Sequence, residues 1–475
     1  MLFLKNDAAF TSPSSYSMDT STQPLTRFSA GSLRELLAIA WPMILSSAAG
    51  CLMIVEDRLI LSRYSPEAFS VNIGSMPWYW AAMDIALSIV SISGVLVGRY
   101  NGARRFSHIG PVVWQMLWFS VFLWIPIMLW LVPFIPRFLA ENIRELGATY
   151  LRIMFYFLPV QCAAFGALAS FFTGRGKTKI VLGVVLVANV ANLLFDWTLI
   201  FGAGPIPPMG IAGAALGSGI AQTMSFGILF FLFLRRRYRH LYRTWDCSFR
   251  WDLWRQCLRI GTPSALTRLI NSFLWAWIIQ VCAQKTSHEE FLIYGMSMTI
   301  YAAFFFLIEG TGYGVTIVDS NAIGSQQMST IVRNTRSWVF LSFAFCGALS
   351  PFMIFYPEPF FRLFSIDFQS ESTALMAREF LIWSWLLFTT EFFHFNYFAI
   401  ITAFGDTIFR MLSAPICYVL LVIIPTYHSL YYGSHRALVF IQCSLLNEVV
   451  MTVLFFVRYQ WLLKRQSARS VLAVA

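Results

Sequence analysis

The amino-acid sequence predicts an all-α polytopic membrane protein with twelve transmembrane helices arranged as two parallel six-helix lobes. Three observations lead to this prediction: the composition, the spacing of the apolar segments and a weak internal repeat. Of the 475 residues, 58% are hydrophobic and only 12% are charged, and the mean hydropathy is +0.65. A composition of this kind is typical of a chain that crosses a bilayer many times, and it excludes an ordinary soluble domain.

The number of helices follows from the apolar segments, since a span needs about 20 apolar residues. Twelve segments meet this requirement, and the gaps between them are too short for a soluble domain. Their centres lie near residues 48, 86, 124, 161, 191, 222, 270, 304, 347, 391, 418 and 448.

Basic residues follow the second, fourth, sixth, eighth and twelfth spans, as the positive-inside rule requires of cytoplasmic loops. They include Arg99, Arg104, Arg105, Arg175, Lys177, Lys179, Arg235, Arg236, Arg237, Arg239, Arg243, Arg333, Arg336, Arg458, Lys464 and Arg465. The sequence therefore predicts a multi-pass protein of a bacterial-type cytoplasmic membrane with both termini in the cytoplasm. The net charge of +11 is explained by topology, so the bilayer is an expected partner and nucleic acid is not.

The two halves resemble each other. LRELLAIAWPMILSSA at 33–48 is similar to WRQCLRIGTPSALTRL at 254–269, which aligns Pro42 with Pro263, and FFTGRGKTKI at 171–180 is similar to IITAFGDTIF at 400–409. Six spans lie between the copies, an even number, so the repeats are parallel, as in many secondary transporters.

These repeats give the predicted domain boundaries. They are a disordered cytoplasmic tail at 1–30, an N-terminal lobe at 31–234, a basic linker at 235–256, a C-terminal lobe at 257–460 and a cytoplasmic tail at 461–475.

Motifs for catalysis or for ATP-driven transport are missing from the sequence. It has no Walker A, G-x-S-x-G, H-E-x-x-H or G-x-G-x-x-G motif, and its eight cysteines and six histidines lack metal-ligand spacing. We therefore expect neither an enzyme nor a bound metal or cofactor.

The most informative polar residues lie in the otherwise apolar segment 180–201. Asn189, Asn192 and Asp196 are spaced i, i+3 and i+7 and so share one helical face. Because an ionised Asp near the middle of a span costs about 2.5 to 3.5 kcal/mol, such a residue indicates a site for ions, protons or substrate.

Several segments together resemble the multidrug and toxic compound extrusion (MATE) family over residues 33–460. They are IVEDRLILSRYSPEAFS, GVLVGRYNGARR, FFTGRGKTKIVLGVVLVANVANLLFDWTLIFG, PPMGIAGAALGSGIAQ and AFGDT. The resemblance implies an acidic site in the N-terminal lobe, formed by Asp57, Asn192 and Asp196, where H⁺ or Na⁺ binding is linked to release of a drug cation. The residue types agree, since carboxylate and amide oxygens hold Na⁺ or share protons in a low dielectric.

Each of these residues also has a structural alternative. For Asn189 and Asn192 the alternative is a hydrogen bond between helices, which weighs evenly with an ion site for Asn189 and less for Asn192 beside Asp196. Asp57, between Glu56 and Arg58, would form an ion pair at the interface, and Asp84 in the second span would pair internally.

The C-terminal lobe departs from the family pattern. One branch of the family has a Glu where this chain has Asn271, while the Asp of its tenth span matches Glu391. His394 follows Glu391 by one turn, and a proton shared between them would suit a relay. Glu309 adds a further polar group to this lobe. The missing carboxylate favours protons over Na⁺ there, and Glu448 and Arg268 are interpreted as structural.

The expected function is a secondary antiporter that exports small organic cations by alternating access in exchange for H⁺ or Na⁺. A flippase of a lipid-linked precursor is the alternative, and a membrane-embedded transferase is a third class for which no catalytic motif is found. We expect a monomer, although no sequence feature defines the oligomeric state.

Overall fold

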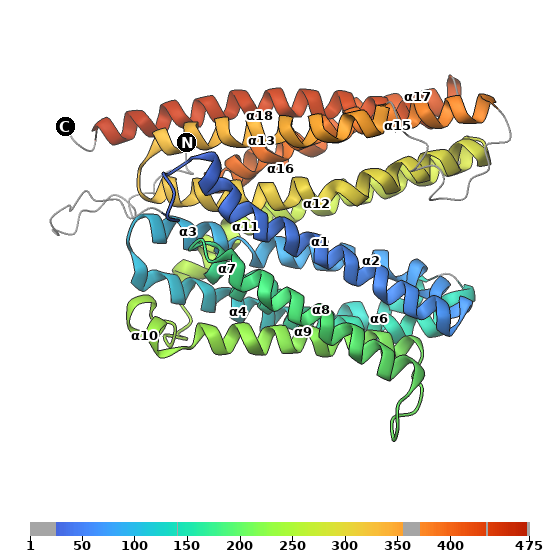
Figure 1. Cartoon of the computed structure of the whole chain (residues 1–475), viewed down its shortest axis with the longest axis horizontal. Coiled ribbons are helices and arrows are strands. Elements are labelled where there is room, and N and C mark those ends of the chain that lie inside the picture. The colour runs from blue at the N-terminus through green and yellow to red at the C-terminus, as the bar shows by residue number, and fades with distance from the viewer. Residues whose placement is uncertain (1–24, 140, 355–370, 434–435, 473–475) are drawn as a thin grey trace.

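The computed structural model describes residues 25–139, 141–354, 371–433 and 436–472. Its helices form two bundles that lie side by side, as Figure 1 shows. The first bundle contains α1 (Leu33–Tyr64), α2 (Pro66–Val90), α3 (Ser93–Gly102), α4 (Ile109–Pro126), α5 (Val132–Phe138), α6 (Arg144–Gln161), α7 (Ala169–Thr173), α8 (Thr178–Phe201) and α9 (Ile211–Phe233). The short α10 (Arg236–Tyr242) follows. The second contains α11 (Trp251–Lys285), α12 (His288–Gly324), α13 (Met328–Ile354), α15 (Glu371–Ala403), α16 (Thr407–Tyr418), α17 (Ile424–Tyr432) and α18 (Leu438–Leu472).

The predicted fold class is confirmed, while the predicted number of twelve spans is confirmed only in part. In the described residues, ten helical segments are long and apolar enough to cross a membrane. The helices α13 and α15 are not among the ten, and α15 carries Arg378, Glu379 and Glu391. All twelve predicted centres nevertheless lie within helical segments.

The predicted tails have different outcomes. Most of the N-terminal tail, residues 1–24, lies outside the described residues. In the predicted C-terminal tail, α18 continues as a helix to Leu472.

Ser residues cap the starts of α1, α2 and α12. The hydroxyl oxygens of Ser32, Ser65 and Ser287 accept hydrogen bonds of 3.2 Å from backbone N–H groups three residues further on. Each bond satisfies one of the N–H groups that a helix start leaves without an intrahelical partner.

The internal repeat is visible in the backbone. Gly176 and Gly405 align in the sequence and have nearly equal positive φ angles of 71° and 70°. In each turn the residue after the glycine donates a backbone hydrogen bond to the carbonyl five residues before it, Lys177 N to Phe172 O at 2.8 Å and Asp406 N to Ile401 O at 3.1 Å. These are Schellman-type helix ends, which favour glycine at the left-handed position.

A second pair of equivalent turns was not recognised from the sequence. Arg104 (φ 55°) after α3 and Gln326 (φ 60°) after α12 take the same left-handed conformation. Arg105 N bonds to Tyr100 O and Gln327 N to Ala322 O, both at 2.9 Å. Segments 94–105 and 316–327 are therefore equivalent, although few of their residues are identical.

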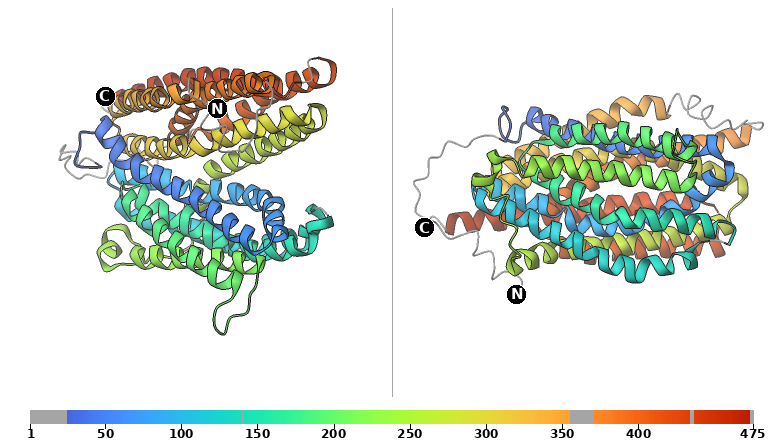
Figure 2. Two further views of the ribbon diagram at one scale, coloured as in Figure 1. Left: turned by 45° about the vertical axis from the view of Figure 1, so that its right-hand side comes forward. Right: turned by 90° about the horizontal axis from the view of Figure 1, so that it is seen from below.

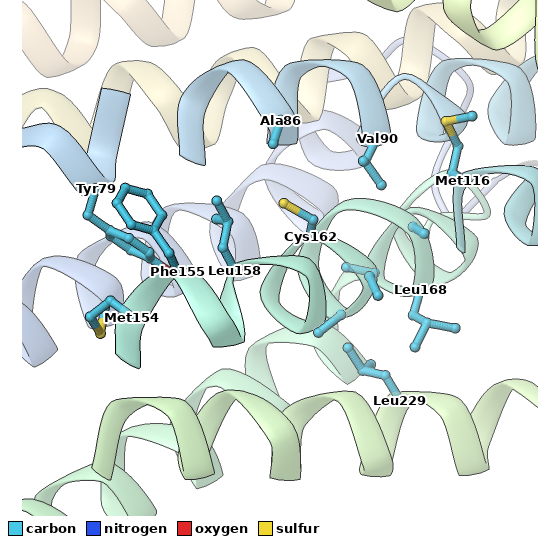
Figure 3. Close-up of a cluster of buried hydrophobic side chains, with 14 of the residues drawn as sticks. Tyr79, Ala86, Val90, Met116, Met154, Phe155, Leu158, Cys162, Leu168 and Leu229 are labelled. Carbon is cyan, nitrogen blue, oxygen red and sulfur yellow. The ribbon is translucent and has the colours of Figure 1, made fainter. Parts of the chain in front are cut away.

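The core of the N-terminal lobe is a continuous apolar cluster between α2, α4, α6 and α9 (Figure 3). Tyr79 packs against Phe155 with ring centroids 5.7 Å apart, and Leu158, Cys162 and Leu229 of the same cluster are fully or almost fully buried. This core holds α8 and α9 against the rest of the lobe.

The basic linker is bound to the N-terminal lobe. The indole N–H of Trp114 donates to Thr244 O at 2.8 Å, and the buried Gln115 side chain donates to Ser248 O at 3.1 Å and accepts from Arg250 N at 3.0 Å. The guanidinium of Arg175 lies over the rings of Phe171, Tyr238 and Tyr242 at 3.6, 4.6 and 4.5 Å, respectively. The linker is thus part of the first lobe up to the start of α11.

Figures 1 and 2 show that the lobes diverge from one end of the bundle to the other. We call the end with the turns at 103–108, 174–177, 325–327 and 404–406 the basic end. Between the lobes, α1 and α3 pack on α12, and α2 packs on α11. The close contacts at glycines, such as Gly310 with Ile44 and Gly261 with Ile89, all involve the halves of these helices nearer the basic end.

Gly176→Ala is expected to destabilise the protein by about 1 to 2 kcal/mol, the penalty of a left-handed conformation for a residue with a Cβ. The Cβ would also lie 3.0 Å from Leu25. The midpoint of thermal unfolding in detergent should fall. The matched control is Gly183→Ala in α8, whose added Cβ meets nothing within 4 Å and which should not lower the midpoint.

Candidate functional site

The polar face predicted for segment 180–201 is turned into the N-terminal lobe. Asn192 and Asp196 on α8 are 0% exposed and Asn189 is also buried. The opposite face carries the exposed Leu186, Val190, Leu194 and Trp197. The helix therefore presents apolar side chains outward and three polar groups inward, as its periodicity predicts.

Asp57 on α1 meets this face and is 5% exposed. Ser218 on α9 lies between the two helices: its hydroxyl is 3.4 Å from Asp57 Oδ2 and accepts from Asn192 Nδ2 at 3.3 Å. The Asp57 carboxylate is also the charged group that acts most strongly on Asp196. We call Asp57, Asn192, Asp196 and Ser218 the N-lobe cluster.

Glycine makes room for Asp196. A Cβ on Gly217 of α9 would lie 2.0 Å from Asp196 Oδ1. Only a residue without a side chain lets α9 approach the carboxylate so closely.

Most acceptor oxygens of the cluster lack a donor among the described residues. They are Asp57 Oδ1, Asn192 Oδ1 and both carboxylate oxygens of Asp196. Leaving buried acceptors unpaired is costly, and two close carboxylates also repel each other. A proton bound to a carboxyl group would reduce this repulsion. A monovalent cation such as Na⁺, which oxygen ligands hold, would serve as the missing partner of the acceptor oxygens.

Asn189 takes the structural role that the sequence left open. Its amide donates to Ala49 O on α1 at 2.7 Å. This bond fixes α8 against α1, next to the cluster.

The alternative predicted for Asp57 is not observed. In the described part of the chain Asp57 makes no ion pair, and the guanidinium of Arg58 lies over the Trp80 ring at 5.8 Å. Asp57 is an internal residue of α1, seven residues before its end.

Sequence reasoning missed two participants. Ser218 lies in GAALGSGIAQ, where the small residues at 213, 217 and 219 signal close helix packing. Tyr150 on α6 is 1% exposed and accepts a 3.1 Å hydrogen bond from Asn72. The charges of Asp57 and Asp196 act electrostatically on its hydroxyl group. Nothing in the sequence around Tyr150 distinguishes it from the other 17 tyrosines.

In the C-terminal lobe the structure corrects the predicted pairing. The imidazole Nδ1 of His394 on α15 contacts the carboxylate of Glu448 on α18, not that of Glu391. Asn447 donates to the other Glu448 oxygen at 3.0 Å, and Glu448 is the charged group that acts on Glu391. Glu448, interpreted from the sequence as structural, is thus central to a half-buried group with Glu391 and His394.

The remaining predicted residues lie apart from these two groups. The side-chain oxygen of Asn271 on α11 is buried without a donor among the described residues. Glu309 accepts from Tyr313 on the same helix at 3.4 Å. The positive charge of Arg268 on α11 acts on the Asp84 carboxyl on α2, so the electrostatic partner of Asp84 belongs to the other lobe.

The family model of MatE matches the chain twice, over residues 42–198 and 263–428. The chain belongs to this family. The two matches begin at Pro42 and Pro263, the residues that the internal repeat aligns. Membership confirms the predicted family, and it confirms a multi-pass membrane transporter rather than an enzyme.

Individual relatives are distant. The chain is 24% identical to the probable multidrug resistance protein NorM of Geobacillus kaustophilus over 74% of this chain and 78% of that protein. It is 23% identical to the probable multidrug resistance protein YoeA of Bacillus subtilis over 78% and 82%. The match to a NorM of Mesorhizobium japonicum, 28% identical, spans about half of that relative, 51%, and 49% of this chain.

Solved structures share the fold. One, described as the outward-facing conformation of a multidrug resistance MATE family transporter, superposes with a TM-score of 0.81 at 17% identity, covering 94% of this chain and 98% of that one. A MOP superfamily transporter from Pyrococcus furiosus gives 0.80 at 16% identity, covering 92% and 97%.

Gly217→Ala is expected to displace the Asp196 carboxylate and to lower the midpoint of thermal unfolding, since overpacking costs about 1 to 3 kcal/mol. Gly227→Ala on the same helix is the matched control, because its Cβ would meet nothing within 4 Å. Equal midpoints for the two variants would contradict the close fit between α9 and Asp196.

Proposed function

We propose that the protein is a secondary antiporter that exports small organic cations in exchange for H⁺ or Na⁺. The observation that carries this proposal is the N-lobe cluster, which holds two buried carboxylates. Three of their oxygens and the amide oxygen of Asn192 lack donors among the described residues. The relatives named above are called probable multidrug resistance proteins, which agrees with an organic-cation substrate.

The coupling follows from the charge of the cluster. Binding of H⁺ or Na⁺ at Asp57 and Asp196 neutralises a buried negative charge and so weakens the attraction for a cationic substrate. The ion shifts the conformational equilibrium only if it binds the two states with different affinity. Each net charge that moves inward through 100 mV supplies about 2.3 kcal/mol, enough for a roughly 50-fold cation gradient. Exchange of one H⁺ or Na⁺ for one monovalent cation moves no net charge and would be driven by the ion gradient alone.

The lobes would alternate access to the space between them. With the basic end in the cytoplasm and the membrane bacterial, as we propose from the basic loops, the divergence of the lobes in Figure 2 faces outward. Neither the flippase nor the transferase alternative is favoured by any feature of the site.

Export is tested with purified protein in liposomes loaded with ethidium, under a proton gradient and then a sodium gradient. We expect one of the two gradients to drive ethidium transport. Asp57→Asn and Asp196→Asn should each reduce the rate of transport to that of liposomes without protein. Both variants remove the charge while keeping the side-chain shape. The control is Asp252→Asn, which removes an exposed carboxylate at the start of α11. Export by Asp196→Asn at the wild-type rate would contradict the proposed site.

Asn271→Glu tests whether coupling is confined to the N-terminal lobe. The substitution introduces the carboxylate present in one branch of the family, but among the described residues the Asn271 side chain makes no hydrogen bond with Glu391 or Glu448. We expect ethidium export with an unchanged rate and ion preference. A changed ion preference would assign coupling to both lobes.

A further inference from the structure

The two lobes approach each other most closely where α3 crosses α12 at the basic end. A Cβ on Gly102 would lie 1.9 Å from Asn321 O, and a Cβ on Gly324 would lie 2.0 Å from Arg99 O. The two helices therefore contact each other backbone to backbone, and each contributes the glycine that permits it.

Two side chains reach across this contact to the opposite lobe. Arg99 on α3 donates to Ala403 O through Nε at 3.0 Å and through Nη2 at 2.6 Å. Asn321 on α12 donates to Gly174 O at 2.8 Å. Asn101 on α3 donates in turn to Asn321 Oδ1 at 2.7 Å, which holds the amide in this orientation.

The two contacts are equivalent under the internal repeat. Arg99 and Asn321 occupy the same position in the equivalent segments 94–105 and 316–327. Their acceptors, Ala403 and Gly174, occupy the same position in the aligned segments 400–409 and 171–180. The last backbone hydrogen bond of each of the four turns, which spans five residues, has its counterpart in the equivalent turn. Each lobe therefore gives the other the same kind of bond.

Both acceptors are carbonyls at the ends of helices. Ala403 is the last residue of α15, and Gly174 directly follows α7. Carbonyls at a helix C-terminus lack intrahelical partners and carry partial negative charge, so they favour donors, and a cationic donor most of all. When the lobes separate, water can replace both donors, which makes the contact reversible.

We propose that Arg99 and Asn321 are gating residues that form a two-part latch, and that both bonds must break before the lobes can open at the basic end. The inference deepens the proposed function, since it rests on alternating access between the lobes. It identifies the contacts that stabilise the state with the basic end closed.

The latch is tested by the distance between spin labels at Lys179→Cys and Ser329→Cys, two exposed positions near the basic end of different lobes. The cysteines that are not buried, Cys51, Cys247, Cys417 and Cys443, are replaced by Ser. The measurement uses the full chain in lipid nanodiscs without substrate or an ion gradient.

We expect a single short distance in the parent protein. Arg99→Gln and Asn321→Ala should each raise the ratio of open to closed molecules about tenfold, and the double variant should raise it about a hundredfold. The matched control is Asn396→Ala, since Asn396 is a buried amide that donates within its own helix, to Phe392 O. This control should leave the distance distribution unchanged.

Gly324→Ala provides a second route if a polar variant fails to fold. Its Cβ would press on Arg99 O and separate α3 from α12 without removing any hydrogen-bonding group. A distance distribution unchanged in both the double variant and Gly324→Ala would overturn the latch.

Export assays separate this outcome from failure of the proposed function. A shifted distance with no export by the parent protein would retain the latch and reject antiport. Coupled export by the parent protein, with distances unchanged in the double variant and in Gly324→Ala, would retain antiport and reject the latch.

Discussion

The cost of placing carboxylates inside a membrane bundle determines much of the N-terminal lobe. Asp57 and Asp196 are almost completely buried and act on each other electrostatically. Neither has an ion pair among the described residues, so the surrounding helices must supply dipoles and space. Ser218 and Asn192 supply the dipoles, and Gly217 supplies the space. Because such a group is unfavourable when fully ionised, its charge state is sensitive to protons and cations, as coupling requires.

The same constraint explains what sequence reasoning achieved. Asp196 and its neighbours were found because a polar face within an apolar segment is a local signal, readable from helical period alone. The structure places all three of these side chains on the inner face. The pairing of Asp57 with α8 came from family resemblance, since no local rule relates residues 139 positions apart.

What the sequence did not predict depends on packing between distant helices. Tyr150 and Ser218 reach the site because α6 and α9 pack together, and the partner of His394 proved to be Glu448 on α18 because α15 and α18 run side by side. The i, i+3 spacing that suggested a pair with Glu391 is compatible with contact on one helix, but it does not exclude a stronger partner on another.

The equivalence of segments 94–105 and 316–327 was missed for a different reason. Both segments end in a left-handed turn after a helix, but Arg104 and Gln326 occupy the left-handed position instead of the usual glycine.

The two lobes share equivalent backbone turns but not the positions of their acidic groups. This difference separates closure at the basic end, to which both lobes contribute, from the proposed ion binding in the N-terminal lobe. The turns at Gly176 and Gly405 and the crossing of α3 with α12 are symmetric, so the lobes close at the basic end by equal contributions. The acidic groups are not symmetric: the N-lobe cluster lies on α1, α8 and α9, whereas Glu391, His394 and Glu448 lie on α15 and α18. In the proposed antiport, the symmetric contact would open and close by a rigid-body rotation between the lobes, and the asymmetric charge would let an ion bias that rotation from one lobe only. On this proposal the ion affinity must differ between the two states, so the helices of the N-lobe cluster would have to change when the contact at the basic end opens. α1 is the element placed to transmit that change, because it carries Asp57 and also packs against α12 of the other lobe.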